Sequence, residues 1–247
     1  MQFIDTSHVN DPIIRSLTLL DEKDTPLFLE EITQTDVPIS LGFVNQHAYN
    51  LIHNNNAIAD NFFALTYRLR DGSGVSIACK YNACNPGANL NGTDFIPLLI
   101  HHILNTAREV NLFIFGTQEP WLTKGGEKLL SAKPFIGIDG FLESNVYVEA
   151  LEDNIKTSQL TLVILAMGMP KQEKLAQEIV ATVDGPVIIV CGGAVVDFCA
   201  GRFSRAPAIF RQFGLEWLYR LCLEPKRLFR RYVLGVPLFF YYMLKNK

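Results

Sequence analysis

The strongest constraint on the fold is an alternation between short, almost continuously apolar segments and segments with helical periodicity. The apolar segments, rich in β-branched and aromatic residues, cover 40–45, 62–69, 111–117, 134–138, 161–168 and 186–193. The helical patterns cover 46–54, 74–80, 94–108, 122–131, 145–155 and 171–182. Strands that are apolar at nearly every position are typical of a parallel sheet covered by helices. We therefore predict an α/β fold with a Rossmann-like, mostly parallel sheet and helices on both faces.

Charge is distributed unevenly and indicates a separate C-terminal segment. Residues 201–247 contain ten Lys and Arg against two acidic residues, so they carry about +8, whereas residues 1–200 carry about −11. We predict an α/β core over 1–200, in which 1–38 is an irregular N-terminal segment, and a basic, aromatic-rich helical appendage over 201–247. A basic appendage on an acidic body favours contact with phosphates. The acidic body argues against a nucleic-acid-binding protein, because it would repel a second phosphate contact.

Cysteine usage and hydropathy indicate the compartment. The five cysteines form no CxxC pair, and their odd number fits a reducing compartment better than a disulfide framework or a zinc site. The first residues, MQFIDTSHVNDPII, lack the basic and apolar regions of a signal peptide. The apolar run 232–244 has 13 residues, whereas a bilayer-spanning helix needs about 20. We expect a cytoplasmic protein that contacts a membrane only peripherally.

Glycines and polar residues stand where the predicted strands end. These positions are Asn45, Asp71-Gly72, Gly116-Thr117, Asp139-Gly140, Gly168–Glu173 and Gly192-Gly193. Ligands of parallel sheets bind outside the carboxyl ends of the strands, where glycine lets the backbone approach and a helix N-terminus offers N–H groups to an anion. These features together predict a phosphate-bearing ligand. The sequence has neither GxGxxG nor a P-loop, so neither a dinucleotide nor a P-loop site is supported.

The segment Gly168–Glu173 joins the fifth predicted strand to a helix. Pro170 suits the first turn of a helix, where its missing N–H is not needed. Gln172 and Glu173 then lie in the first helical turn and face the carboxyl edge of the sheet. Glu173 also suits the positive end of the helix dipole. Ligand contact and simple helix capping are both compatible with this pattern.

Asp71 follows an apolar strand and precedes Gly-Ser-Gly. A carboxylate at this edge of the sheet could act as the general base for a hydroxyl nucleophile. It could equally cap the helix that begins near Ser73, and the pattern alone favours capping.

The appendage contains a basic helix beside aromatic and apolar residues. Pro225 is expected to start a new helix, in which Arg227, Arg230 and Arg231 fall on one face. Such a face fits an interfacial helix on an anionic membrane, and arginine also binds phosphate bidentately. A solvated charged face is the alternative. The five histidines have no metal-ligand spacing and no DxD pair occurs, so we predict no metal and no cofactor.

Three blocks of the sequence resemble the WecG/TagA/CpsF glycosyltransferases, which form glycosyltransferase family 26. The blocks are AMGMPKQE (166–173), CGGAVVDFCAGRFSRAP (191–207) and GLEWLYRLCLEPKRLFRRY (214–232). Weaker matches precede them at FVNQH around Asn45, DGSGV (71–75), NGTDF (91–95), IFGT ending at Thr117 and DGF (139–141). The resemblance spans roughly residues 40–235, and the blocks follow one another in the order and spacing of the family.

The resemblance implies an inverting, metal-independent transfer of a sugar from a UDP-sugar to a polyprenyl-diphosphate-linked saccharide at the cytoplasmic membrane face. The product would feed a bacterial cell-surface polysaccharide such as teichoic acid, capsule or exopolysaccharide. The family's proposed base corresponds to Asp71, and its active-site Asn and Gln correspond to Asn45 and Gln172. Its appendage arginines correspond to Arg220, Arg227 and Arg230. The full set of expected substrate contacts is Asn45, Thr93, Asp94, Gly168, Gln172, Glu173, Gly193, Asp197, Arg205, Arg220, Arg227 and Arg230.

The chain departs from the family pattern at Phe43, Asn89 and Thr117. These positions leave the donor open among UDP-ManNAc, UDP-ManNAc-uronate and UDP-glucose. They also motivate an alternative, a non-catalytic sugar-nucleotide or lipid-binding scaffold on the same fold, although Asn45, Asp71 and Gln172 argue against it. The chain could also form a homo-oligomer through an exposed apolar edge near the appendage.

Overall fold

A six-stranded sheet, parallel throughout, forms the centre of the molecule. The computed structural model describes residues 1–106, 108–156, 158–204, 206–207, 210 and 216–247. The strands are β1 (Ile39–Val44), β2 (Tyr67–Arg70), β3 (Val110–Gly116), β4 (Ile136–Ile138), β5 (Leu160–Ala166) and β6 (Val187–Cys191). Their order across the sheet is β2-β1-β6-β5-β3-β4, and every pair is parallel. The predicted parallel α/β fold is confirmed.

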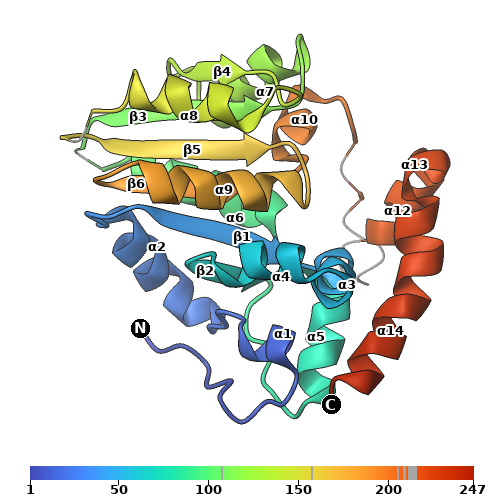
Figure 1. Ribbon diagram of the computed structural model, residues 1–247. Coiled ribbons are helices and arrows are strands. Elements are labelled where there is room, and N and C mark those ends of the chain that lie inside the picture. Colours follow the sequence, from blue (N-terminus) through green and yellow to red (C-terminus); the bar gives the residue numbers. More distant parts are fainter. Residues whose placement is uncertain (107, 157, 205, 208–209, 211–215) are drawn as a thin grey trace.

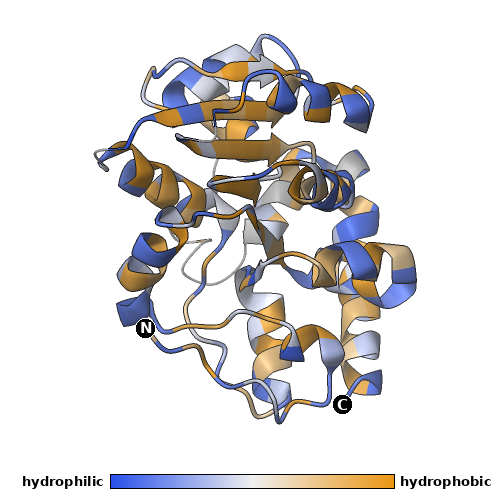
Figure 2. Cartoon of the chain, turned by 60° about the vertical axis from the view of Figure 1, so that its left-hand side comes forward, coloured by the Kyte–Doolittle hydropathy of each residue, from blue (hydrophilic) through white to orange (hydrophobic). Residues whose placement is uncertain are grey.

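Two hydrophobic cores cover the two faces of the sheet. The first face carries α3 (Gln46–Asn54), α4 (Asn56–Phe63), α5 (Gly72–Tyr81), α8 (Ser144–Glu152) and α9 (Lys171–Thr182). The second carries α2 (Thr25–Thr33), α6 (Gly92–Leu104), α7 (Trp121–Leu129) and α10 (Val195–Ala200). Successive strand residues alternate between the cores, as Phe113 and Phe115 face the first and Leu112 and Ile114 the second. The central strands β1, β3, β5 and β6 are therefore mostly hydrophobic along their length (Figure 2), whereas the edge strand β2 contains two arginines, Arg68 and Arg70.

The segment expected to be irregular, 1–38, contains helices and is part of the core. It holds α1 (Pro12–Arg15), the short η1 (Glu22–Asp24) and α2. Ile13 and Ile14 of α1 are buried, and the carboxylate of Asp11 accepts hydrogen bonds from their backbone N–H groups. Thr18 forms a parallel bridge with Leu69 of β2, so this segment also covers one edge of the sheet. Its polar composition hid helices in which most of the few apolar residues are buried, with Leu27 of α2 as an exposed exception.

The predicted strand over 62–69 is wrong in its first half. Residues 62–63 end α4, whose N-terminus is capped by the Asn55 side chain accepting from the Ile58 N–H, and β2 begins only at Tyr67. Phe62 is fully buried on the inner face of this helix, whereas Phe63 is exposed, so this aromatic pair belongs to a helix although its composition is typical of a strand. Helix α10 was also not predicted.

The C-terminal segment is helical, as predicted, but its last helix belongs to the core. It comprises α12 (Glu216–Leu223), α13 (Pro225–Phe229), the π-helical turn η2 (Arg230–Leu234) and α14 (Gly235–Lys245), and α13 begins at Pro225 as expected. Phe239 of α14 is buried against Tyr49 of α3 with ring centroids 5.0 Å apart. The side-chain amide of Asn50 donates to the Gly235 carbonyl at 2.7 Å. The last helix of the appendage is therefore packed against α3 and the core.

The helices α12–α14 stand along the side of the molecule toward which the strands point (Figure 1). This places the basic segment beside the carboxyl edge of the sheet. Among the described residues, no helix is both long enough and apolar enough to cross a bilayer.

Candidate active site

Asp71 and Asn45 meet at the carboxyl ends of two neighbouring strands. Strands β1 and β2 pair with Val44 opposite Arg70, so the residues that follow them lie side by side. The Asn45 Nδ2 donates to Asp71 Oδ2 at 3.1 Å, while its Oδ1 accepts from the backbone N–H groups of His47 and Ala48 and caps α3. The amide oxygen of Asn45 thus anchors the side chain on α3, and its NH₂ group holds the Asp71 carboxylate.

The capping role considered for Asp71 is not what the side chain does. Asp71 occupies the N-cap position of α5, yet its carboxylate makes no capping hydrogen bond. The carboxylate is half-buried, and Asn45 is its one hydrogen-bond donor among the described residues. It therefore has room to accept a further proton or hydrogen bond from a ligand.

Arg70 and Asn89 shape the backbone beside Asp71. The Arg70 guanidinium is buried and donates to the carbonyls of Pro86, Gly72 and Gly87 at 2.8, 3.1 and 3.0 Å. Asn89 Oδ1 accepts from the Gly72 N–H at 2.9 Å. The family departure at Asn89 thus has a structural role in holding the turn that carries Asp71.

Gln172 joins the turns that follow β5 and β6. Its Oε1 accepts from the backbone N–H of Gly168 at 3.2 Å and from that of Gly193 at 3.0 Å. Both glycines have positive φ, +79° and +56°, and a methyl group built on either would meet no atom within 4 Å, so both border open space. Gln172 itself is 1% exposed. Gln172 therefore holds the backbone of the two turns together. We call these turns the backbone wall of the site; Gly168 and Gly193 lie at its surface.

Glu173 is buried behind that wall. Its Oε1 accepts from Gln172 Nε2 at 2.8 Å, and its Oε2 is buried without a hydrogen-bond partner. Burial raises the pKa of Glu173 to about 7, and hydrogen bonds from Gln172 and from its own backbone N–H offset only part of this effect. The helix has no side-chain cap at this end, so Glu173 neither caps α9 nor faces solvent as its position suggested.

Asp197 belongs to a polar group beyond the end of β3. Its Oδ1 accepts from the Thr117 hydroxyl at 2.7 Å and from Arg202 Nη1 at 3.1 Å. Arg202 also lies over the rings of Trp121 and Phe203. Asp197 and Thr117 were both singled out from the sequence, whereas Arg202 was missed. Arg202 stands directly after Gly201 in the second family block, which was the available signal.

Thr93 and Asp94 lie in the first turn of α6. Asn91 caps this helix, accepting from the Asp94 N–H at 3.1 Å and donating to its carboxylate at 2.9 Å. Phe43 at the end of β1 packs against Gly92 and Phe95 and is 3% exposed. The departure at Phe43 is therefore a core substitution below this helix end. Asn91 was not singled out from the sequence, although an Asn three residues before an Asp is a capping pattern.

The appendage brings a cation to the first turn of α3. Arg205 lies outside the described residues, as do the side chains of Arg220 and Arg227. Arg230 is exposed, whereas Arg231 is half-buried. Burial and, to a smaller extent, the charge of Arg231 lower the pKa of His47 to about 4. The arginine face predicted for one regular α-helix is thus interrupted by the π-turn, and Arg231 approaches the helix that Asn45 caps.

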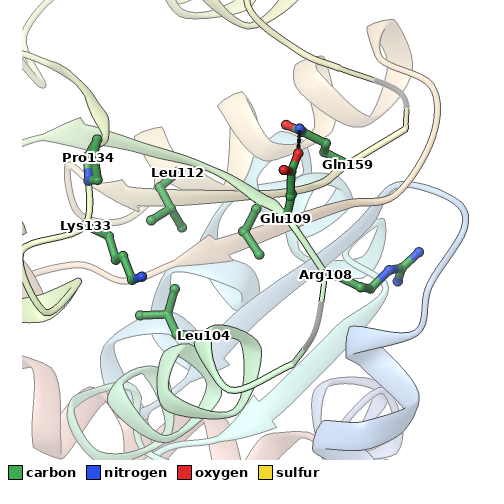
Figure 3. A pocket seen from close by; sticks show the side chains of 8 residues that line it. Leu104, Arg108, Glu109, Leu112, Lys133, Pro134 and Gln159 are labelled. Carbon is green, nitrogen blue, oxygen red and sulfur yellow. Dashed lines mark hydrogen bonds between the residues drawn. The ribbon is translucent and has the colours of Figure 1, made fainter.

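The hollow drawn in Figure 3 lies away from this edge. It has a volume of about 330 Å³ and is lined by Leu104, Arg108, Glu109, Val110, Leu112, Lys133, Pro134 and Gln159. These residues include the amino end of β3, opposite the strand ends that carry Asp71 and Gln172. In the described part of the chain no group of three or more His, Cys, Asp or Glu side chains could hold a metal ion.

The fold and the site define a Rossmann-like α/β protein whose polar groups gather at the carboxyl edge of its sheet, the usual ligand position in this class. The profile of the glycosyl transferase WecG/TagA/CpsF family matches residues 14–247, and the chain belongs to this family of glycosyltransferases. It is also similar to an N-acetylglucosaminyldiphosphoundecaprenol N-acetyl-beta-D-mannosaminyltransferase of Bacillus spizizenii. The two are 28% identical over 180 residues, which are 72% of this chain and 68% of the relative.

Proposed function

We propose that this protein transfers N-acetylmannosamine from its UDP-activated form to a polyprenyl-diphosphate-linked N-acetylglucosamine, with inversion at the anomeric carbon and without a metal ion. The observation that carries the proposal is the Asn45–Asp71 pair, a carboxylate held at one point beside the open edge of the sheet. The acceptor and the sugar are those on which the Bacillus spizizenii relative acts. The product would serve a cell-surface polysaccharide of the teichoic acid type.

Asp71 is the general base in this proposal. The acceptor hydroxyl loses its proton to the carboxylate as its oxygen attacks the anomeric carbon of the donor, and the bond to UDP breaks on the opposite side. The Asn45 N–H fixes the carboxylate and leaves its other oxygen for the proton. The departing diphosphate would lie against the Gly168 and Gly193 turns, with appendage arginines supplying positive charge.

The departures at Phe43 and Asn89 do not favour the scaffold alternative. Phe43 fills the core beneath α6, and Asn89 supports the turn of Asp71 through the Gly72 N–H. Each side chain has a structural role in this chain, and neither removes the Asn45–Asp71 pair.

The direct test is turnover with defined substrates. The purified chain is incubated with a short-chain polyprenyl-diphosphate N-acetylglucosamine and either UDP-ManNAc, UDP-ManNAc-uronate or UDP-glucose, with and without EDTA. We expect UDP release and a β-linked disaccharide with UDP-ManNAc, unchanged by EDTA. Absence of turnover with every donor contradicts the proposal, whereas a preference for another donor corrects only the sugar.

The appendage docks the enzyme on the membrane surface in this proposal. Several of its apolar side chains are exposed, among them Leu223, Phe229, Leu234, Leu238 and Leu244. They lie in the run of helices α12–α14 that also contains Arg230 and Arg231, so apolar insertion and attraction to anionic lipid act together. Self-association through these side chains remains an expectation that light scattering at several protein concentrations would test.

Point variants test docking better than truncation, because α14 is packed into the core. Phe229→Glu and Leu234→Glu should reduce co-sedimentation with phosphatidylglycerol vesicles several-fold. The control is Leu98→Glu on α6, a side chain that is 46% exposed on a helix outside the appendage. Equal vesicle binding by all three variants would exclude this docking surface.

A further inference from the structure

The side-chain amide of Gln172 must point its oxygen, and not its NH₂ group, toward the Gly168 and Gly193 turns. Its Oε1 receives two backbone N–H groups, one from the turn after β5 and one from the turn after β6. If the side-chain amide were rotated by half a turn, its NH₂ group would face these two donors and both hydrogen bonds would be lost. The two turns are therefore connected only in one of the two orientations of this amide.

Glu173 is the group that selects this orientation. Its Oε1 accepts from Gln172 Nε2 at 2.8 Å and would face an oxygen in the rotated state. Glu173 is 0% exposed and takes part in none of the described ion pairs. A buried carboxyl group is costly unless a specific interaction requires it. The bond to Gln172 is the interaction that its position provides.

We propose that Glu173 is a positioning residue that locks the Gln172 amide, so that Gln172 connects the Gly168 and Gly193 turns into one preformed wall. The N–H groups of both turns are then directed inward, and the Cα faces of the two glycines are held toward the open space. The consequence for catalysis rests on the proposed function, in which this wall receives the donor diphosphate. The structural claim concerns three hydrogen bonds and holds for any ligand.

The raised pKa of Glu173 supports this role. Oε2 has no partner, so it has room for the proton of the neutral carboxyl group, while Oε1 stays an acceptor for Gln172 in either protonation state. The Cys191 thiol at the end of β6 is the ionisable group that interacts with Glu173 in the described part of the chain; burial and, to a smaller extent, the charge of Glu173 raise its pKa well above the usual value. The interaction that orients Gln172 is therefore kept whether or not Glu173 is ionised.

Two substitutions separate the acceptor from the shape of the side chain. Glu173→Gln keeps an oxygen that can accept from Gln172, whereas Glu173→Met has a similar length and no such oxygen. Amide hydrogen exchange at Gly168 and Gly193 is measured by NMR, with Leu41 in β1 as an internal reference for the fold. We expect exchange at both glycines to accelerate at least about tenfold in Glu173→Met, to stay within about threefold of wild type in Glu173→Gln, and to leave Leu41 unchanged.

Ligand binding is measured on the same proteins. UDP should bind at least about tenfold more weakly to Glu173→Met, and KM for the donor should rise more than kcat falls, while Glu173→Gln restores both. Wild-type exchange and affinity in Glu173→Met overturn the proposal. If Glu173→Met does not fold, fast exchange at both glycines in the wild type, or loss of protection in Glu173→Gln, overturns it equally. If the wild type binds no UDP, the proposed function fails, but the exchange rates still decide the role of Glu173.

Discussion

The two walls of the candidate site are built in opposite ways. At the ends of β1 and β2, a half-buried carboxylate is presented to the open edge and is held by the side chain of Asn45. At the ends of β5 and β6, the side chains of Gln172 and Glu173 are buried, and the glycine backbone at 168 and 193 borders open space. One wall therefore offers a titratable side chain, and the other offers a fixed shape. A polar residue at a strand end can therefore contribute to a site in two ways. It can face the ligand itself, as Asp71 does, or it can hold the backbone that faces the ligand, as Gln172 does.

The largest expected effect is at the side-chain wall. Asp71→Asn should lower the rate of sugar transfer by about 10² to 10⁴, because the amide cannot take the acceptor proton. UDP binding should stay within about twofold of wild type, measured by calorimetry. The matched control is Asp60→Asn, an exposed carboxylate on α4, which should leave both quantities unchanged. Transfer at the wild-type rate by Asp71→Asn would remove the distinction between the walls.

At the backbone wall the largest expected effect is on how the free energy of unfolding changes with pH. The pKa of Glu173 is raised from 4.5 to about 7 in the folded chain. The folded state therefore binds the proton more tightly than the unfolded state, and the stability this provides is present below pH 4.5 and is lost as pH rises through about 7. A shift of this size corresponds to roughly 3 kcal/mol. Urea unfolding at pH 5 and pH 8 should show this loss in the wild type and not in Glu173→Gln; parallel profiles would contradict a buried, titrating Glu173.

A smaller effect is expected from a substitution at Asn45 that keeps its helix-capping oxygen and removes its hydrogen bond to Asp71. Asn45→Asp keeps an oxygen to cap α3 but places a second carboxylate against Asp71 instead of an N–H donor. Transfer should fall about tenfold with a change in unfolding free energy below about 1 kcal/mol, since the cap is retained. Asn55→Asp is the control, because Asn55 caps α4 through the same oxygen and lies outside the site. If Asn45→Asp transfers normally, the hydrogen bond to Asp71 has no role in positioning the base.

The smallest effect concerns the surface of the backbone wall. Gly193→Ala places a methyl group toward the open space at φ +56°, so it should weaken UDP binding about fivefold and cost about 1–2 kcal/mol of stability from the left-handed backbone. Gly185→Ala, at φ +91° beyond α9 and before β6, should cost similar stability and leave UDP binding unchanged. Equal UDP affinity in the two variants would show that Gly193 does not border the ligand.

The sequence predicted the central strands well because they are apolar at nearly every position, and it placed the edge strand β2, which contains Arg68 and Arg70, less accurately. It placed Asp71 and Asn45 at one edge, since neighbouring parallel strands end together. It could not predict that Gln172 is buried, because its acceptor role depends on Gly193, which lies 21 positions later in the chain. Helix α1 was missed because its few apolar residues stand in a polar segment. Helix α4 was missed because its last residues, Phe62 and Phe63, have a composition typical of a strand.

The appendage shows a similar limit. The apolar run 232–244 suggested a segment that contacts the membrane surface. In the structure, Phe239 and Met243 of this run are instead packed in the core beside α3. Hydropathy reports how apolar a helix is but not which of its faces another helix already covers.

The π-helical turn Arg230–Leu234 decides where the appendage tolerates a change in length. A π-turn contains one residue more than the α-helical turn it replaces, and successive residues of a helix are about 100° apart around its axis. Because the wide turn accommodates this extra residue, deletion of one residue within 230–234 should restore a regular α-helical turn and leave α12 and α13 in nearly the same orientation relative to α14. A single-residue insertion or deletion at the start of α14, before its contacts with α3, should instead rotate the preceding helices by about 100° and redirect their whole surface.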